Sequence, residues 1–433
     1  MHWMRKKVLV LLILLGMTSI FSSLTATNHP HMNLATDTNN YKIIWIMKKA
    51  ENFPNSLRWS LFPAYNDNDG VMAGLVLTNQ NSTENRKFSF VLAPMYSFKM
   101  SKLLGHGKIS YDVMKQEGRI DKFSYWLGVK SFDFNHNNKF DYSLRYIKLE
   151  PGVSVHLKPK DKKDNTSTIT FKTAFISEDK ALFNLNEFSA ITQEYFIIPR
   201  LEYFYSMHDE YQGTDIRLSS EYQGYNNESY LKLTATGDQK YRYAENKFLF
   251  FRAFVSGFLI NSQRYSSSFQ NIFTRGSIAL IHHGFNDYTY DETFLSRQNQ
   301  TGFQNDQISL TSGGGFKTPV GSAYGIGMSN HFAASFGFSS DIPFRLPKWI
   351  PLRAYFDIGS YSTYSSVKFK NNIIYNGGLS LHYRDIGAIY IPLFFSDNLG
   401  SIYKSEHKSF FSRISFSINL NKIELGKLPS NVY

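Results

Sequence analysis

The sequence predicts an all-β fold, a transmembrane antiparallel β-barrel of about 16 strands, and three observations support it. Apolar and polar side chains alternate with a period of two along most of the chain. Many alternating segments reach about ten residues, which is the length that crosses a bilayer as a tilted strand. The chain holds 38 Phe and 28 Tyr, yet its mean hydropathy is −0.31. A barrel explains both values, because its strands are apolar toward lipid and polar toward the lumen.

The N-terminal region has the features of a secretory signal peptide. Three basic residues at positions 5–7 precede an apolar run over 8–21, and Leu24-Thr25-Ala26 offers a cleavage site. A membrane anchor helix is the alternative, but the apolar run is short for a bilayer span. The predicted organisation is a signal peptide over 1–26, a short periplasmic lead over 27–55, an outer-membrane barrel over 56–421 and a tail over 422–433.

Roughly sixteen segments fit the strand pattern, and many exceed the length of about five or six residues that is usual in soluble proteins. They lie near residues 56–66, 70–80, 87–100, 104–116, 120–135, 140–160, 166–179, 189–207, 214–225, 228–244, 246–260, 324–341, 350–363, 373–384, 386–397 and 410–421. No segment after the signal peptide shows a helical period.

The last predicted strand, residues 410–421, shows the alternation most clearly. Phe416 and Ile418 belong to one face, and Arg413 belongs to the other. The segment 324–341 repeats this pattern. A soluble β-sandwich alternates as well, so the number and length of the strands decide in favour of the barrel.

One connection is far longer than the others. Residues 261–311 are rich in Gln, Asn, Ser and Gly, and they join the eleventh predicted strand to the twelfth. Counted from a periplasmic N-terminus, this loop begins outside the cell. Long loops in compact architectures are usually functional or disordered, and the prediction is a lid or plug that folds back into the lumen.

Composition excludes several classes of function. The chain has no cysteine, which excludes disulfides, a thiolate metal site, a cysteine nucleophile and a lipid anchor on cysteine. Its net charge is +12, but the basic residues are spread along the strands instead of clustered, which argues against nucleic acid as a partner. Anionic membrane lipid and lipopolysaccharide are the more natural partners for this charge.

Motifs of catalysis and cofactor binding are absent. No histidine is followed by glutamate as in a zinc protease, and there is no nucleophile elbow, Walker loop or dinucleotide fingerprint. Neighbouring strand residues such as His282 and His283 point to opposite faces, which argues against a shared metal. Asp67-Asn-Asp-Gly70 resembles part of a calcium loop, but it lacks the downstream glutamate and reads better as a hairpin turn.

A barrel enzyme that acts on lipid requires a positioned Ser/His pair. His106, His382 and His407 are the candidates, and nothing in the sequence orients any of them. We therefore predict no enzyme activity, no catalytic residue, no cofactor and no metal. Charged residues on the predicted inner face, including Arg353, Asp357 and Arg413, either grip a plug or simply form a satisfied polar lumen.

Several short motifs resemble a known family. The run from Trp59 to Gly74 (WSLFPAYNDNDGVMAG) looks like the start of the Bacteroidetes-type outer-membrane barrel that follows the catalytic domain of gluzincin aminopeptidase-like proteins. The pieces Leu92-Ala-Pro-Met-Tyr96, Asp287-Tyr-Thr-Tyr-Asp291, Gly313-Gly-Gly-Phe-Lys-Thr-Pro319, Leu352-Arg-Ala-Tyr-Phe-Asp-Ile-Gly359 and Tyr390-Ile-Pro-Leu393 are similar to the same family. The likeness spans about residues 52–422, without a peptidase domain.

The layout more distantly resembles the surface-antigen barrels of outer-membrane assembly and secretion factors. These have sixteen strands and a lid loop between strands eleven and twelve, with an Arg-Gly motif that reaches into the lumen. Arg275-Gly276 lies in the corresponding loop here, and Arg297 is a second candidate. The resemblance implies that a lid arginine meets acidic groups on the inner wall, such as Asp357.

These observations leave three functions open. The first is a non-enzymatic, surface-antigen-like Gram-negative barrel that anchors, exports or assembles a protein partner in the periplasm or an exported client. The second is a passive, porin-like channel, and the third and weakest is a lipid-acting barrel enzyme. A blocked lumen favours the first, an open lumen the second, and a lipid-exposed Ser/His pair the third.

Overall fold

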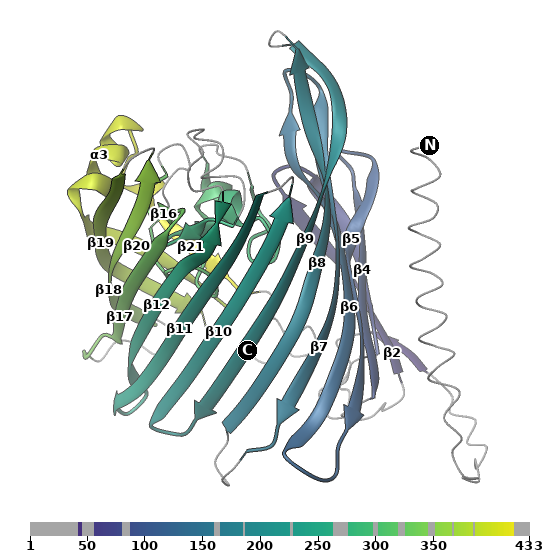
Figure 1. Ribbon diagram of the computed structural model, residues 1–433, viewed down its shortest axis with the longest axis horizontal. Coiled ribbons are helices and arrows are strands. Elements are labelled where there is room, and N and C mark those ends of the chain that lie inside the picture. The colour runs from purple at the N-terminus through teal and green to yellow at the C-terminus, as the bar shows by residue number, and fades with distance from the viewer. Residues whose placement is uncertain are drawn as a thin grey trace. The chain divides into compact units, whose positions relative to one another are not determined.

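The computed structural model describes residues 42–45, 56–79, 87–159, 165–184, 187–225, 228–262, 276–297, 302–318, 325–344, 351–365, 368–383 and 386–419. The predicted signal peptide and C-terminal tail lie outside these residues, as does most of the predicted lead. Lys42–Tyr433 form one compact unit (Figure 1). Within it the described strands form one large sheet and two small ones.

The large sheet has seventeen strands, and sixteen of them form one continuous antiparallel ladder. The exception is β1 (Lys42–Trp45), which lies within the predicted lead and pairs in parallel with the first strand of the ladder. The ladder consists of β2 (Ser56–Asn66), β3 (Gly70–Thr78), β4 (Phe88–Ser97), β5 (Lys102–Met114), β6 (Ile120–Asn137), β7 (Tyr142–Leu157), β8 (Asn165–Asn184), β9 (Glu187–His208), β10 (Gln212–Tyr225), β11 (Glu228–Ala244), β12 (Lys247–Asn261), β17 (Phe332–Asp341), β18 (Leu352–Ser365), β19 (Lys368–Tyr383), β20 (Gly387–Phe395) and β21 (Ser415–Ile418).

This wall confirms the predicted antiparallel barrel of about 16 strands. Each strand pairs with the next strand of the ladder, and β12 and β17 are its eleventh and twelfth strands. Phe62 of β2 and Ser417 of β21 line the same cavity, so the two ends of the ladder face one lumen. The long connection therefore lies where the sequence predicted it.

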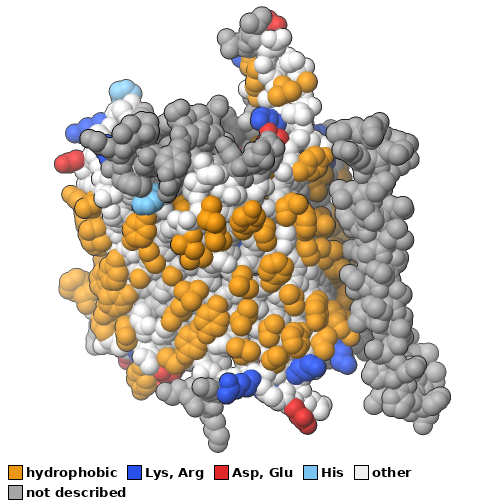
Figure 2. Space-filling view, in the orientation of Figure 1, with side chains coloured by type: hydrophobic (Ala, Val, Ile, Leu, Met, Phe, Trp, Pro, Cys, Tyr) orange, Lys and Arg blue, Asp and Glu red, His pale blue; other side chains and the backbone are white. Residues whose placement is uncertain are grey.

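The two faces of the wall differ in the way that a membrane requires. Ile373 is 62% exposed on the outer face, while the next residue, Ile374, is fully buried. Val255 and Phe254 repeat this contrast on β12. Figure 2 shows apolar side chains covering the strands, with Lys, Arg, Asp and Glu near the margins. Because a midplane Arg or Lys facing lipid costs about 2–4 kcal/mol, this pattern is that of a membrane-spanning barrel.

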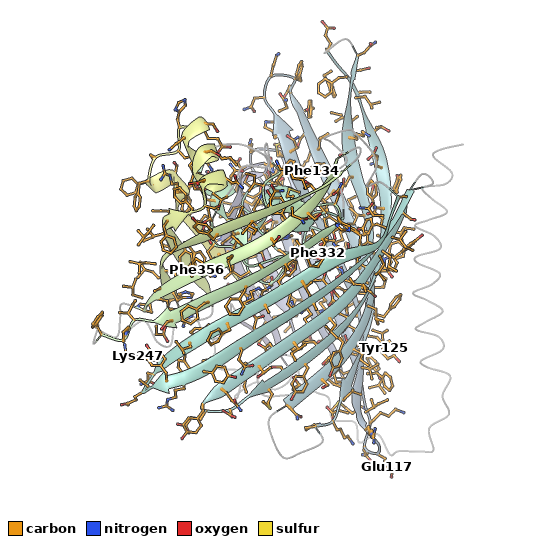
Figure 3. The ribbon with its side chains drawn as sticks, turned by 60° about the vertical axis from the view of Figure 1, so that its left-hand side comes forward. Glu117, Tyr125, Phe134, Lys247, Phe332 and Phe356 are labelled. Carbon is orange, nitrogen blue, oxygen red and sulfur yellow. The ribbon has the colours of Figure 1, made fainter. Side chains whose placement is uncertain are left out.

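Connections alternate between the two ends of the wall, because successive strands run in opposite directions. Short turns such as 209–211 and 245–246 lie at one end, which we call the turn end. The connection 262–331 begins and ends at the opposite end of the wall, which we call the loop end. Figure 3 shows Glu117 and Lys247 at the turn end and Phe134 toward the loop end. At the loop end the β8–β9 hairpin projects beyond its neighbours (Figure 1).

The prediction of one strand over 324–341 was wrong in its first half. The wall strand begins only at Phe332, and Gly325 and Gly327 have φ of 58° and 73°. These left-handed conformations interrupt an extended strand and are open to glycine. The connection between β12 and β17 consequently runs to residue 331 and is longer than the predicted 261–311.

The predicted strand over 410–421 is also shorter in the structure. Phe411–Arg413 form the 3-10 turn η6, and β21 covers only Ser415–Ile418. The Ser412 backbone N–H donates to the Ser409 hydroxyl, and the Ser412 hydroxyl donates to the Ser409 carbonyl. Such local serine bonds compete with a strand ladder.

A helix that the sequence analysis missed precedes this turn. Helix α3 (Asp397–Ser405) buries Leu399, Ile402 and Tyr403, which share one face at helical spacing. The helix has only three apolar positions and lies in a polar connection, so its helical period is too short to be recognised in the sequence. No helix in the described part of the chain is long and apolar enough to span a membrane.

Candidate functional site

The described part of the connection between β12 and β17 is folded inside the barrel, where it lines a cavity together with wall residues. We call residues 276–318 the plug, of which the structure describes 276–297 and 302–318. Two small sheets organise it, because β13 (Ile278–Ala279) pairs with β16 (Met328–Ser329) and β14 (His282–His283) pairs with β15 (Ile308–Ser309). The 3-10 turns η3 (Gly284–Asn286) and η4 (Phe303–Asp306) lie between β14 and β15.

One half of the plug is apolar and packs against the wall and α3. Leu280, Ile281 and Phe316 of the plug share a buried cluster with Phe254, Ala333, Tyr361, Ile374, Leu399 and Ile402. Burying an apolar side chain of this size contributes about 1.5–3 kcal/mol. This half therefore anchors the plug to the C-terminal part of the wall.

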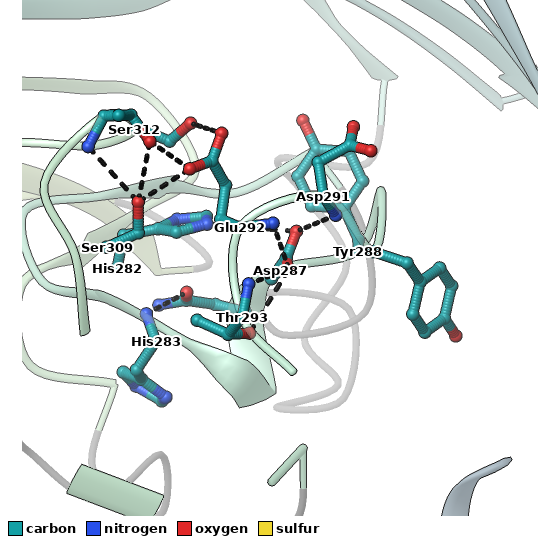
Figure 4. Close-up of polar contacts among 12 residues, drawn as sticks. His282, His283, Asp287, Tyr288, Asp291, Glu292, Thr293, Ser309 and Ser312 are labelled. Atoms are coloured by element: carbon teal, nitrogen blue, oxygen red, sulfur yellow. Dashed lines mark hydrogen bonds and ion pairs between the residues drawn. The ribbon is translucent and has the colours of Figure 1, made fainter. Parts of the chain in front are cut away.

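The other half is polar and is organised by the carboxylate of Asp287 (Figure 4). Its oxygens accept hydrogen bonds from the backbone N–H groups of Asp291, Glu292 and Thr293 at 2.9–3.2 Å. The guanidinium of Arg297 completes the set, with Nη2 at 3.1 Å from Oδ2. Residues 287–297 consequently form a closed turn around one buried charge.

Two further acceptors join this turn to the rest of the plug. The carboxylate of Glu292 accepts from the hydroxyls of Ser309 and Ser312 at 2.8 and 3.0 Å, and also from Thr311. Oε1 of Gln307 accepts two backbone N–H groups of the turn. These hydrogen bonds tie the turn to residues 307–312 of the plug.

Aromatic rings hold the turn against the wall. The ring of Tyr290 stacks on that of Tyr146 of β7, with centroids 3.7 Å apart and planes inclined by 10°. The guanidinium of Arg297 lies 4.6 Å from the Tyr290 ring centroid. Stacking and cation–π contacts of this kind each contribute about 0.5–2 kcal/mol.

An ion pair and a hydrogen bond join the same turn to β7 and β6. Oδ1 of Asp291 lies 2.6 Å from Nζ of Lys148. Nζ of Lys130 donates to the backbone carbonyl of Tyr290 at 2.7 Å. The turn thus presents a carboxylate and a carbonyl to two lysines that lie opposite each other in the register of β6 and β7.

Tyr288 makes a second polar contact with the wall. Its hydroxyl hydrogen-bonds to both the carboxylate of Glu221 and the ammonium of Lys232. Glu221 also pairs with Lys232 at 3.0 Å and with Arg200. The tyrosine thereby joins a network that crosses β9, β10 and β11.

The C-terminal end of the plug is tied to β17, β18 and β21. Nζ of Lys317 lies 2.5 Å from Oδ1 of Asp357, and the Lys317 carbonyl accepts from the Ser415 hydroxyl at 2.6 Å. The Ser335 hydroxyl donates to the Gly314 carbonyl at 2.7 Å. These contacts hold residues 314–317 against the wall.

The neighbours of the turn favour the charged forms of its ionisable side chains. Burial raises the pKa of Asp287, but Arg297 and His282 lower it by more, so its pKa lies below the ordinary value. Burial likewise raises the pKa of Asp291, and the lysines of the wall, led by Lys148, reverse the shift. Burial lowers the pKa of Arg297, and Asp287 more than restores it.

Two other plug groups favour their neutral forms. Burial raises the pKa of Asp306 to about 7, against a smaller lowering by Lys408. Burial, reinforced by His282 and Lys408, lowers the pKa of His283 to about 3.

A cavity of about 1360 Å³ lies between the plug and the wall. Charged side chains from β5 to β11 line it, together with the plug residues Asp291 and Arg297. Its lining reaches Ile418, which pairs with Gly387 at the turn end. The described part of the plug thus occupies only part of the lumen and leaves this cavity open.

The structure separates the predicted partners of the lid. Arg297 lies in the plug as predicted, but its carboxylate is Asp287 of the same turn and not Asp357. Asp357 pairs with Lys317 instead. Gly276 has a φ of +69°, and a Cβ there would lie 2.5 Å from the Tyr230 ring. Arg275 lies outside the described residues.

The other two candidate arginines lie away from the plug turn. Nε of Arg353 is 2.7 Å from Oδ1 of Asp341, which lies opposite it in the register of β17 and β18. The guanidinium of Arg413 lies 5.3 Å from the ring centroid of Tyr403 in α3. Both therefore stabilise the wall or its margin.

The predicted Ser/His and His/His candidates have other surroundings. Nε2 of His382 lies 3.0 Å from the Ser380 hydroxyl, but its Nδ1 faces Arg353 and not a carboxylate. Ser380 is fully buried and does not face lipid. No group of three or more His, Asp or Glu in the described residues is arranged to hold a metal ion, His282 and His283 included.

Sequence reasoning missed the residues that organise the turn. The sequence motifs include Asp287 and Asp291 only as the ends of a family-like segment, and they include neither Glu292 nor Gln307. The available signal was the density of carboxylates next to Tyr and Thr in a loop otherwise poor in charge. Their partners come from distant strands, which no local pattern reveals.

Comparison with known proteins yields fold likeness only. No protein-family model matches the sequence, and no curated protein matches it. The crystal structure of BamA from Haemophilus ducreyi lacking POTRA domains 1–3 is similar over 79% of this chain and 69% of that chain, at 9% identity and a TM-score of 0.41. CdiB from Acinetobacter baumannii is similar over 79% of this chain and 56% of that chain, at 11% identity and a TM-score of 0.38. Scores this low carry no inference about family or activity.

Proposed function

We propose that this chain is a non-enzymatic integral barrel of a bacterial outer membrane, exported by its signal peptide. In this proposal it is surface-antigen-like and serves as an anchor or as an export or assembly module, with the plug as the lid of its lumen. Its proposed partners are outer-membrane lipid and lipopolysaccharide, and a protein in the periplasm or an exported client.

The carrying observation is the way in which the plug is held. The plug has two small sheets and a buried charged turn of its own, so it is a folded element inside the barrel. It also contacts the wall on both sides of the lumen, through Lys148 on β7 and Asp357 on β18. This degree of order supports a closed resting state.

A passive channel is the second candidate, and the cavity between the plug and the wall favours it. The cavity of about 1360 Å³ is lined by charged side chains and reaches the turn end. If a path continues past the plug, small solutes diffuse through the intact protein.

Conductance distinguishes the two. His283 and Ile308 are paired partners in the β14–β15 register, so Asn-Gly can replace residues 284–307 as a two-residue hairpin turn. This variant keeps the apolar half and removes the polar half. Wild type and variant are reconstituted in planar bilayers at the same protein-to-lipid ratio.

The proposal expects a low conductance from the wild type and a large, steady one from the variant. A matched control replaces residues 182–190 at the tip of the β8–β9 hairpin by Asn-Gly, since Ala181 pairs with Ile191 there. The control should behave as the wild type. A large, steady wild-type conductance would reject the lid and favour the channel. A variant as silent as the wild type would reject the idea that residues 284–307 close the lumen.

A further inference from the structure

The polar turn of the plug sits on a band of basic side chains that crosses the inner wall. We call it the basic belt, and it consists of Lys130, Lys148, Lys172, Arg200 and Lys232 on β6, β7, β8, β9 and β11. In the sheet register Lys130 lies directly opposite Lys148, and Lys172 directly opposite Arg200. Like charges in directly opposed positions destabilise a sheet, so the belt needs compensating anions.

The wall supplies too few of them. Glu150 pairs with Lys148 at 2.7 Å, Glu202 lies between Lys172 and Arg200, and Glu221 pairs with Arg200 and Lys232. Three wall carboxylates thus pair with four of the five cations. Among the described residues, no carboxylate lies within 4 Å of the Lys130 ammonium, whose hydrogen bond goes to the Tyr290 carbonyl.

The plug corrects this imbalance. In the cavity lining, the wall contributes seven basic side chains and four carboxylates, and the plug contributes one basic side chain and three carboxylates. Of the plug carboxylates, Asp291 reaches the belt and pairs with Lys148 at 2.6 Å. A loop of opposite charge therefore fills a positively charged recess.

We propose that the basic belt is an anion-binding site, and that Asp291 of the plug occupies it as an internal ligand. The ligand class is a small solute that bears a carboxylate or a phosphate. It reaches the belt through the cavity from the turn end and competes with Asp291. This assignment goes beyond the proposed function, because it holds whether or not the plug gates a passage.

Chemical rescue tests the site. Asp291→Ala removes a group of the size of formate and leaves Lys148 without its plug carboxylate. The readout is trypsin cleavage after Arg297, whose side chain is 8% exposed while the turn is closed. The full-length protein in detergent is treated with sodium formate, sodium phosphate or sodium chloride at equal ionic strength.

The variant should be cut at least tenfold faster than wild type in chloride, and formate should restore protection with a saturable dose response. Restoration by phosphate as well would extend the site to both anions, and restoration by formate alone would limit it to carboxylates. The double variant Lys148→Met with Asp291→Ala should gain no protection from either. Equal cleavage in formate, phosphate and chloride, or equal rescue of the double variant, would overturn the proposal.

Competition in the unaltered protein provides the second arm. Pyrophosphate added to wild type should speed cleavage after Arg297 severalfold and saturably, because it displaces Asp291 from the belt. Lys148→Met should show no saturable response. A response that merely follows ionic strength, and is the same in both proteins, would show salt screening and reject a site.

Discussion

Replacing Asp287 by asparagine should open the polar turn of the plug while the barrel stays folded. The carboxylate and the Arg297 guanidinium are 1% and 8% exposed, and the same carboxylate accepts three backbone N–H groups. Removing one partner of a buried ion pair costs about 3–5 kcal/mol, because the other charge stays buried without compensation. Asparagine keeps one acceptor oxygen, so the lower end, about 3 kcal/mol, applies. Each 1.4 kcal/mol is a factor of ten, so the open population should rise about a hundredfold.

Trypsin cleavage after Arg297 measures this population, since cleavage follows the open fraction when opening and closing are fast. The Asp287→Asn variant should be cut about a hundredfold faster, with unchanged β-sheet circular dichroism. Lys180→Gln is the control, because it breaks an ion pair on the projecting hairpin whose lysine side chain is 54% exposed. Exposed pairs contribute about 0–1 kcal/mol, so this variant should match the wild type. Equal cleavage of Asp287→Asn and wild type would refute the role of Asp287 as the organiser of the turn.

Three further changes probe the plug by the same cleavage assay. Tyr290→Leu keeps an apolar side chain but loses the ring stack on Tyr146 and the contact with Arg297. The closed turn should lose about 1–3 kcal/mol of stability, and an unchanged cleavage rate would contradict the stacking geometry. Asp306 has a pKa raised from 3.8 to about 7, so the stability that it contributes is present below pH 3.8 and is lost as pH rises through 7. Asp306→Asn should therefore reduce the loss of protection between pH 5 and 8. An unchanged pH profile would show that Asp306 does not cause this loss. His283 has a pKa lowered from 6.5 to about 3, so its contribution to stability is present above pH 6.5 and is lost as pH falls toward 3. His283→Asn should therefore reduce the loss of protection between pH 6.5 and 4.5. A variant that loses protection in acid as the wild type does would show that His283 is not the cause.

The wall could be predicted from the sequence because its signal is local and repeated. Each strand carries its own period of two, and a slip by one residue would turn every side chain to the wrong face. The strand number and the position of the long connection follow from counting such segments. The prediction was wrong at 324–331 and 410–414, although the sequence alternates there as in a strand. The positive φ of Gly325 and Gly327 interrupts the first segment, and a local Ser409–Ser412 hydrogen bond interrupts the second.

The interior of the plug could not be predicted in this way, because its partners are distant in sequence. Arg297 and Asp357 are both buried charges, yet each pairs with a residue other than the one expected. The choice between Asp287 and Asp357 depends on how the turn folds, and that fold depends on backbone N–H groups that every sequence has. Residue type indicated a charged lumen, and only the tertiary structure assigned the pairs.

The two halves of the plug differ in how easily they can leave the wall. The apolar half loses about 1.5–3 kcal/mol for each side chain that it exposes, and water offers Leu280 or Phe316 nothing in return. The polar half exposes Tyr290 when it leaves the wall, but most of its contacts are ion pairs that become hydrated charges. Such pairs contribute little net stability, because desolvation offsets most of their attraction. A competing anion on the basic belt removes the remaining net stability of the Asp291–Lys148 pair, because the anion pairs with Lys148 while Asp291 becomes hydrated. The energetically favoured motion is therefore release of residues 284–307 with the apolar half still docked, and this is the segment that the hairpin replacement removes.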